Sequence, residues 1–299
     1  MRTTTIGKQR TLEAIHGAMN AHDAKKLASL FTESAVITDA GVPIVARGRD
    51  SIEARYRRSF DAFSDFTAAP SRIFVTGDVA IVEWSWRGTH TGDLGPAKAT
   101  HEPTGAAAVD VLWFAADGRV EVLHSYCDWN TVLAHVGASP ARVRPIPDLA
   151  TRPLIVTNGG EAEPQNLAMA RTMLGAWEKK SVSDFVQHLA DDETWDDLTQ
   201  AETIRGKPAS KQLFADWIKA FPDAKTDTMN AWAIGDFVIV EGTFSGTHQG
   251  AFAGIPPTKK SLHVHGIDIL QFDDGKIVKG WSYTNGLEAA TQLGLVPPR

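Results

Sequence analysis

The chain has 299 residues, of which 43% are hydrophobic and 22% charged, and its formal net charge is −6 with a pI near 5.9. That length exceeds the usual size of a single domain and predicts two domains. Because no run of Lys or Arg forms a basic stripe, the sequence lacks the electrostatic signature of a protein that binds nucleic acid or anionic membranes.

Cys127 is the only cysteine, which excludes an internal disulfide and suits a reducing compartment. The N-terminal segment has no apolar core of signal-peptide length. No apolar stretch approaches the roughly 20 residues that span a bilayer. We therefore expect a cytoplasmic protein without a membrane partner.

The first third of the chain predicts helices. Apolar residues recur near the 3.6-residue period between Leu12 and Met19 and again between Leu27 and Phe31, and Asp23 can cap the second of these helices. A third amphipathic pattern follows from residue 48 to residue 63. The sequence then changes to β-rich runs at 72–90 around a Thr-Gly-Asp turn, at 105–115, and from 119 to about 127. Helices followed by an antiparallel meander are typical of an α+β fold.

The second half of the chain repeats the first at an offset of 158 residues. The matched segments are Arg47-Gly48 with Arg205-Gly206, Ile81-Val82-Glu83 with Ile239-Val240-Glu241, Gly88-Thr89-His90 with Gly246-Thr247-His248, and Asp110, Leu112 and Phe114 with Asp268, Leu270 and Phe272. After a one-residue slip, Ser125-Tyr126 matches Ser282-Tyr283. A register that holds without gaps from about residue 39 to 114 indicates a duplication of one domain.

Prolines concentrate between the two copies, together with an Asn-Gly-Gly turn at 158–160. This composition predicts an extended, semi-rigid linker. We expect copy 1 at residues 1–140, the linker at 141–164 and copy 2 at 165–299. Within the linker, the apolar run Leu154-Ile155-Val156 favours a short strand, through which the linker would pack in part against a domain.

Several motifs of copy 2 resemble a known family. These are Gly246-Thr247-His248-Gln249-Gly250, Gly254-Ile255-Pro256-Pro257-Thr258, Gly266-Ile267-Asp268-Ile269, Asp274-Gly275-Lys276-Ile277-Val278 and Gln292-Leu293-Gly294-Leu295. They are similar to SnoaL-like polyketide and ester cyclases of the nuclear-transport-factor-2-like superfamily. Copy 1 keeps the Gly-Thr-His and Asp-Gly motifs but lacks the Gly-Ile-Pro-Pro turn. The resemblance implies a cone-shaped α+β barrel with a mostly apolar cavity, paired either within the chain as a pseudo-dimer or as a homodimer.

The resemblance also implies proton-transfer chemistry without a metal or organic cofactor, in which an acidic residue late in the last strand removes a proton beside a carbonyl. Asp128 stands at that place in copy 1, and His124 and Tyr126 share its strand face because they precede it at spacings of two. Copy 2 has Asn285 there, which cannot act as a base. The competing interpretation is that Asp128 caps the C-terminal helix.

Asp39 is a second candidate base, since it lies in a segment that looks like the one in which ketosteroid isomerases place a catalytic Asp. Its repeat partner is Asp197. A carboxylate kept in both copies fits a retained catalytic role. It equally fits a loop residue that caps a turn.

Histidines form a third candidate group. His90 and His248 occupy the same place in both copies, near the end of a strand, and His90 or Tyr126 could hold an oxyanion. His263 and His265 point to one face of a strand, but no third and fourth ligand at a suitable spacing supports a metal site. A hydrogen-bonded structural role is the alternative for each of these histidines.

The remaining candidates are side chains that could line a ligand cavity. The aromatic ones are Trp84, Trp86, Phe244 and Tyr283, to which His124, His263, His265 and Asn285 add polar groups. Their alternative role is to fill the core.

Three functions remain open. The first is a cyclase or isomerase that acts on an apolar carbonyl compound, with copy 2 as a degenerate twin. The second is a non-catalytic carrier or sensor of an apolar metabolite. The third is an interaction scaffold, favoured if aromatic side chains fill both cavities.

Overall fold

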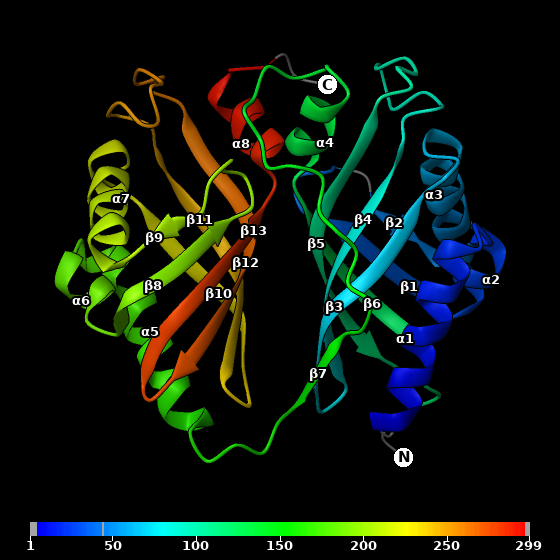
Figure 1. Cartoon of the computed structure of the whole chain (residues 1–299), viewed down its shortest axis with the longest axis horizontal. Coiled ribbons are helices and arrows are strands. Elements are labelled where there is room, and N and C mark those ends of the chain that lie inside the picture. Colours follow the sequence, from blue (N-terminus) through cyan, green and yellow to red (C-terminus); the bar gives the residue numbers. More distant parts are fainter. Residues whose placement is uncertain (1–4, 44, 297–299) are drawn as a thin grey trace. The chain divides into compact units, whose positions relative to one another are not determined.

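A computed structural model describes residues 5–43 and 45–296, and the chain divides into two compact units at the peptide between Thr157 and Asn158. Each unit has its own helices and its own sheet (Figure 1). The predicted fold class, two tandem α+β domains, is confirmed.

The first unit contains α1 (Thr5–Asn20), α2 (Ala24–Ser29), β1 (Phe31–Asp39), β2 (Ala46–Arg47), α3 (Gly48–Ala62), β3 (Thr67–Thr76), β4 (Val79–Thr89), β5 (Pro103–Phe114), β6 (Val120–Cys127), α4 (Trp129–His135) and β7 (Leu154–Thr157). Its sheet has the strand order β2-β1-β6-β5-β4-β3-β7. Strand β1 pairs with β6 in parallel and β3 with β7 in parallel, whereas the other neighbours are antiparallel.

The second unit contains α5 (Glu163–Lys179), α6 (Val182–Val186), β8 (Leu189–Asp197), β9 (Ile204–Arg205), α7 (Lys207–Ala220), β10 (Lys225–Ile234), β11 (Phe237–Thr247), β12 (Ser261–Asp273), β13 (Lys276–Thr284) and α8 (Gly286–Leu293). Its sheet has the order β10-β11-β12-β13-β8-β9, with β8 and β13 parallel. The two units therefore share one topology, apart from the additional strand β7 in the first.

Local sequence explains the boundaries that position the sheet. Asp23 accepts a hydrogen bond from the Lys26 backbone N–H at 2.8 Å and so caps α2, as the sequence predicts. Gly77 has φ +53° in the tight turn that joins β3 to β4, a conformation open to glycine without steric cost. The long antiparallel strands that follow carry alternate side chains towards the helices.

The proline-rich connection packs against the first unit rather than running free. Strand β7 extends the sheet beside β3, with Arg72 opposite Leu154 and Val75 opposite Thr157. The His135 ring Nε2 also lies 2.8 Å from the Arg144 carbonyl oxygen. The part of the expected linker that pairs with β3 is therefore a strand of the copy 1 sheet.

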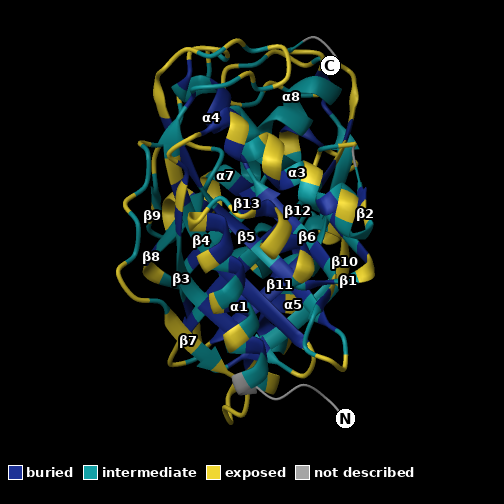
Figure 2. Cartoon of the chain, turned by 90° about the vertical axis from the view of Figure 1, so that its right-hand side faces the viewer, coloured by how far each residue is buried: buried dark blue, intermediate teal, exposed yellow. Residues whose placement is uncertain are grey.

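The sheets are open rather than closed into the barrels that the resemblance implies, because β2 and β7 are edges of the first and β10 and β9 edges of the second. Buried residues follow the strands and the inward helix faces, while exposed residues lie in the loops and on the outer helix faces (Figure 2). A single large cluster, which includes Leu12, Phe31 and Phe63, forms the core of the first unit. Two smaller clusters, around Met173 and Phe221, form that of the second.

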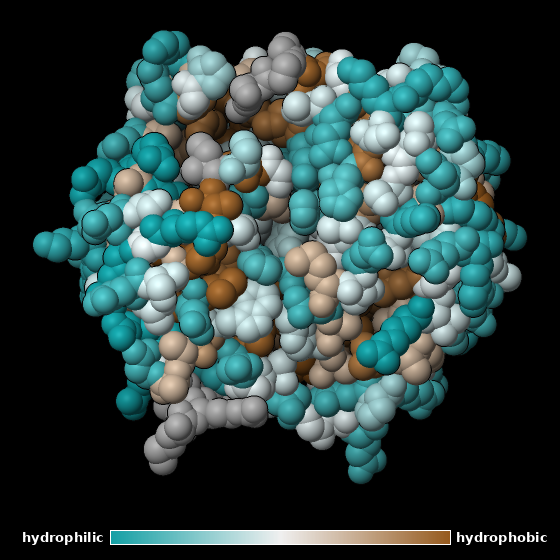
Figure 3. Space-filling view, turned by 180° about the vertical axis from the view of Figure 1, so that it is seen from behind, coloured by the Kyte–Doolittle hydropathy of each residue, from teal (hydrophilic) through white to brown (hydrophobic). Residues whose placement is uncertain are grey.

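The surface drawn in Figure 3 is mostly hydrophilic, with hydrophobic side chains in separate areas. Within residues 5–43 and 45–296, none of the helices combines the length and the apolar character needed to cross a membrane.

Candidate active site

A row of polar side chains crosses the helix-packed face of the first sheet. Asp39 at the end of β1 lies beside Ser125 of β6, and Ser125 lies opposite Asp110 of β5. Trp84 of β4 is a diagonal neighbour of Asp110, since the partners across β4 and β5 are Val82 with Asp110 and Trp84 with Ala108. Four neighbouring strands thus bring together residues that are far apart in sequence.

Helix α3 adds a cation to this row. The Arg55 guanidinium donates two hydrogen bonds to the Asp39 carboxylate, one of them from Nε to Oδ2 at 2.9 Å. Both side chains are largely buried. A bidentate pair of this kind fixes the orientation of both groups. Asp39 is therefore engaged as the partner of Arg55 and has little freedom to act as a base.

The row borders a cavity of about 60 Å³. Its walls are mainly aromatic and apolar, formed by Met19, Tyr56, Phe60, Phe63, Phe66, Trp84, Trp86, Cys127 and Trp129, and its polar lining comes from Asp39, Arg55, Ser59, Asp110 and Ser125. The volume holds a few water molecules or one small functional group. Any larger ligand needs the walls to move.

Asp110 is the carboxyl group in this cavity with the most perturbed acidity. Burial raises the pKa of Asp110 to about 6, against the opposing effects of hydrogen bonds with Ser125 and Trp84 and of the Arg55 charge. Its Oδ1 atom is shielded from solvent. A carboxyl group with these properties can exchange a proton near neutral pH.

Burial also raises the pKa of the Tyr56 phenol and of the Cys127 thiol, so both groups keep their protons. Cys127 is therefore a poor nucleophile. Tyr56 packs its ring against the Arg55 guanidinium, 4.9 Å from the ring centroid, and helps to hold the cation in place.

Copy 2 repeats the row with different neighbours. Asp197, Ser282 and Asp268 lie on adjacent strands in the register of Asp39, Ser125 and Asp110. Burial again raises the pKa of Asp268 to about 6, and Asp197 adds to the rise. Here the Ser282 hydroxyl accepts a hydrogen bond from the indole Nε1 of Trp195 at 2.9 Å.

The two copies differ at two positions whose side chains lie near Asp110 in copy 1. Leu213 replaces Arg55 at the repeat offset, and Gly242 replaces Trp84. A Cβ atom at Gly242 would lie 2.3 Å from the Asp227 carbonyl oxygen, so this backbone has no room for a tryptophan. The interior of copy 2 instead gathers aromatic rings on its helices. Trp177 and Trp217 both contact Phe244, with ring centroids 5.2 Å apart in each case.

Asp128, the first candidate from the sequence, caps α4. Its carboxylate accepts hydrogen bonds from the backbone N–H groups of Asn130 at 3.0 Å and Thr131 at 3.1 Å, and from the Thr131 hydroxyl at 2.6 Å. Asn285 caps α8 in the same way through Leu287. The Asp-to-Asn difference between the copies is therefore a difference between two helix caps.

The alternation of β6 separates His124 and Tyr126 from the cavity. Ser125 and Cys127 line it, so the residues between them point to the opposite face. His124 packs there against Trp113, with ring centroids 4.7 Å apart. Tyr283 occupies the corresponding face of β13, since Ser282 belongs to the helix-packed row.

His90 and His248 are buried at equivalent points and bind the loops that follow them. The Nδ1 atom of His90 lies 3.1 Å from the Thr100 hydroxyl, and that of His248 lies 3.2 Å from the Thr258 hydroxyl. Each ring also packs against a phenylalanine, Phe63 or Phe221. Neither histidine lines the cavity around Asp110.

His263 and His265 lie near α8, where the His265 ring Nδ1 is 3.4 Å from the Glu288 carboxylate. Their rings contact each other at 5.5 Å. Across the described ranges of the chain, no three His, Cys, Asp or Glu side chains form a group that could hold a metal ion.

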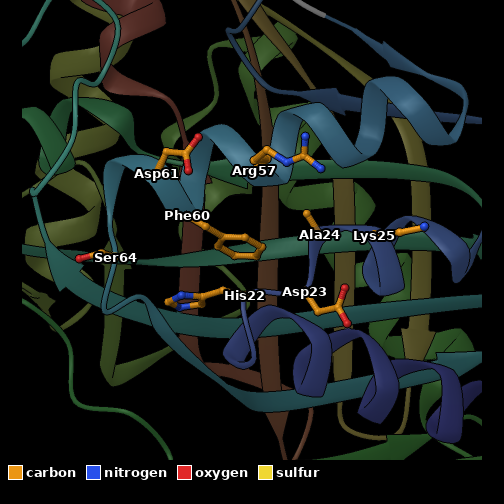
Figure 4. A pocket seen from close by; sticks show the side chains of 8 residues that line it. All are labelled: His22, Asp23, Ala24, Lys25, Arg57, Phe60, Asp61 and Ser64. Atoms are coloured by element: carbon orange, nitrogen blue, oxygen red, sulfur yellow. The ribbon is translucent and has the colours of Figure 1, made fainter.

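A second hollow, of about 400 Å³, opens between the α1–α2 turn and α3 in copy 1 (Figure 4). His22 and Phe60 stack at its base, with ring centroids 4.9 Å apart. Phe60 also lines the cavity of Asp110, so the two spaces share this residue in their linings. The charged side chains around the hollow have both signs.

Helices packed on a mixed sheet, with a row of polar side chains across that sheet, occur in both copies. A family model of SnoaL-like polyketide cyclases matches residues 167–293, and a model of the SnoaL-like domain matches residues 12–124. The chain therefore belongs to the SnoaL-like family and is a tandem of two such domains, which confirms the resemblance drawn from the sequence.

Similar solved structures match about one copy each. AclR from Streptomyces galilaeus, a proposed hydroxylase, is 27% identical over 46% of this chain and 85% of its own, with a TM-score of 0.42. IdmH from Streptomyces antibioticus, a proposed polyketide cyclase, is 26% identical over 44% of this chain and 98% of its own, with a TM-score of 0.39. TsrD from Streptomyces laurentii is 20% identical over 45% of this chain and 98% of its own, with a TM-score of 0.42. No curated protein matches the chain significantly.

Sequence reasoning did not select Asp110 as a site residue. Its signal is visible in the repeat, because a single carboxylate stands in an apolar strand as Val109-Asp110-Val111 and again as Ile267-Asp268-Ile269. A charged residue retained on the buried face of both copies is costly unless it has a role.

Proposed function

We propose that copy 1 is a cofactor-free acid–base catalyst of the cyclase or isomerase type, which acts on a small apolar carbonyl compound with Asp110 as its base. The observation that carries this proposal is the Asp110 carboxyl group, which lines a cavity with aromatic walls and has a pKa raised to about 6 by burial. Membership of the SnoaL-like family supports the reaction type.

The chemistry follows from the surroundings of Asp110. Above pH 6 the carboxylate is ionised, and its burial makes it a stronger base than an exposed Asp. It takes a proton from the carbon beside the carbonyl: the C–H bond breaks, an O–H bond forms at Asp110, and the electron pair moves to the carbonyl oxygen. The enolate then regains a proton elsewhere, which is isomerisation, or attacks a second carbonyl carbon, which is cyclisation.

The role of Asp39 in this proposal is to hold Arg55. The guanidinium lowers the pKa of Asp110 from the value that burial alone would impose, and it offsets the charge that develops in the cavity. Copy 2 lacks this cation, because Leu213 stands in its place, and so its Asp268 sits beside a second carboxylate. We assign the reaction to copy 1 for that reason.

The test is deuterium exchange at the carbon beside the carbonyl of cyclohexanone and 2-indanone, followed by proton NMR in D₂O. The wild-type chain is expected to accelerate exchange, Asp110→Asn to abolish the acceleration, and Asp128→Asn to retain it. Exchange that survives Asp110→Asn would overturn the assignment of the base. Binding of these ketones without exchange would favour the alternative of a non-catalytic carrier.

A further inference from the structure

A cluster of three aromatic rings connects the hollow of copy 1 with the cavity of Asp110. His22 lines the hollow, Phe66 lines the cavity, and Phe60 lines both. The ring centroids are 4.9 Å apart for His22 and Phe60, and 6.0 Å apart for Phe60 and Phe66. The Phe60 ring projects from α3 towards His22 (Figure 4). Phe60 is therefore the residue at which the walls of the two spaces meet.

Copy 2 keeps the hydrogen bond that anchors this turn. His22 has φ +53°, and its ring Nε2 lies 2.8 Å from the Phe66 carbonyl oxygen. Lys180 lies at the repeat offset from His22 and has the same φ. Its Nζ donates a hydrogen bond to the carbonyl oxygen of Ala224, which is the repeat partner of Phe66. The anchor is thus a feature of the shared fold, whichever side chain provides it.

The rings themselves are not repeated. At the repeat offset, copy 2 has Lys180, Ile218 and Ala224 in place of the three rings. The fold therefore does not need aromatic side chains at these positions. They occur in the copy whose carboxylate row contains Arg55. Rings that the fold does not require, placed where two spaces meet, point to a role in the passage of a ligand.

We propose that the hollow and the cavity are two parts of one ligand site, and that the Phe60 ring moves aside to join them. The cavity, at about 60 Å³, holds one small functional group, whereas the hollow, at about 400 Å³, has the size of a small-molecule site. Contacts between aromatic rings are individually weak, so the Phe60 ring can leave its neighbours while α3 stays folded. A ligand then reaches the carboxylate row with one end and keeps the other end in the hollow.

The two parts of the site differ in chemistry, and the difference defines the class of ligand. The cavity is walled mainly by aromatic and apolar side chains, whereas Lys25, Arg57 and Asp61 give the hollow charges of both signs. An elongated molecule with an apolar end in the cavity and a polar end in the hollow matches both. Such a site serves a carrier as well as a catalyst, so this inference goes beyond the proposed reaction and does not depend on it.

Cys127 reports access to the cavity, because the one cysteine of the chain lies in the cavity wall. The experiment measures how fast benzyl and methyl methanethiosulfonate modify Cys127 in the full chain at one alkaline pH. Phe60→Leu is expected to accelerate the benzyl reagent about tenfold or more, and the methyl reagent less, because both ring contacts across the passage are lost. Phe114→Leu is the matched control and is expected to keep the wild-type rates, since Phe114 is buried in the same core cluster and lines neither space.

Ser64→Trp tests the hollow as the route of entry, because Ser64 is an exposed residue of the hollow and an indole there narrows it. This variant is expected to slow the benzyl reagent about tenfold. The second measurement is protection of Cys127 by 6-phenylhexan-1-ol, a probe with one apolar and one polar end. The probe is expected to slow modification of the wild-type chain and to lose most of this effect in Ser64→Trp.

Unchanged benzyl rates in Phe60→Leu or in Ser64→Trp overturn the inference, because the reagent then enters by another path. Equal acceleration in Phe60→Leu and Phe114→Leu also overturns it, since a loosened core then explains the access. Failure of 6-phenylhexan-1-ol to protect the wild-type chain overturns the class of ligand. A wild-type chain that shows the expected rates but no ketone exchange contradicts the proposed function alone.

Discussion

Replacing Asp110 by Asn is expected to stabilise the protein while it removes the base. Burial gives the carboxyl group a pKa of about 6 in the folded chain, against 3.8 for the ordinary side chain. This rise in pKa corresponds to about 3 kcal/mol, because one pKa unit is about 1.4 kcal/mol. Asn carries no charge and avoids this cost.

The raised pKa of Asp110 determines how its contribution to stability depends on pH. A carboxyl group with a raised pKa binds its proton more tightly in the folded state than in the unfolded state. Below about pH 4 the group is protonated in both states, and its burial does not lower the free energy of unfolding. Between about pH 4 and pH 6 the loss of stability grows, and above about pH 6 it is constant. The stability advantage of Asp110→Asn over the wild type should therefore increase by about 2 kcal/mol between pH 4.5 and pH 8.

The assay is urea denaturation at several pH values, read from the transition of the first unit. Asp110→Asn and the wild type are compared at each pH, so that the titration of other groups cancels. A gap that does not change with pH, or a variant that is less stable than the wild type at pH 8, would refute the reasoning. Either result would mean that the carboxylate is adequately solvated or paired in the folded chain.

Three further variants test separate parts of the structure. Asp128→Ala removes the cap of α4 and should cost about 1–2 kcal/mol in thermal or urea unfolding while ketone exchange persists; loss of exchange by the folded variant would restore Asp128 as a base. Arg55→Leu leaves Asp39 buried without its partner and should cost about 3–5 kcal/mol, whereas an unchanged midpoint would show that the pair is weak. Glu193→Gln should stabilise the second unit above neutral pH but not at pH 4, because burial raises the pKa of Glu193; equal effects at both pH values would contradict this.

Much of the fold follows from local patterns in the sequence. The repeat, the amphipathic helix that became α3, and the Gly77 turn all depend on residues near one another in the chain, and each is found in the structure. The parallel pairing of β1 with β6 joins segments that lie more than eighty residues apart, and no local pattern reports such a contact. The same pairing is what brings Asp39 to Ser125.

The candidate site was harder to predict because alternation shows which residues share a face but not which face turns towards the helices. His124 and Tyr126 do share a face of β6, and it is the one opposite the cavity. Asp128 adjoins the end of that strand, where its oxygens are more useful as a helix cap. Asp110 could be recognised once the strand register placed it beside Ser125 and Arg55.

The pH profile of ketone exchange tests the central claim most directly. With Asp110 as the base, the rate for the wild-type chain should rise with pH, pass its midpoint near 6 and then level off, because only the ionised carboxylate accepts the proton. The Asp110→Asn chain should show no enzymatic rate at any pH. A midpoint near 4, the value of an ordinary carboxyl group, or an unchanged profile in Asp110→Asn would contradict the account.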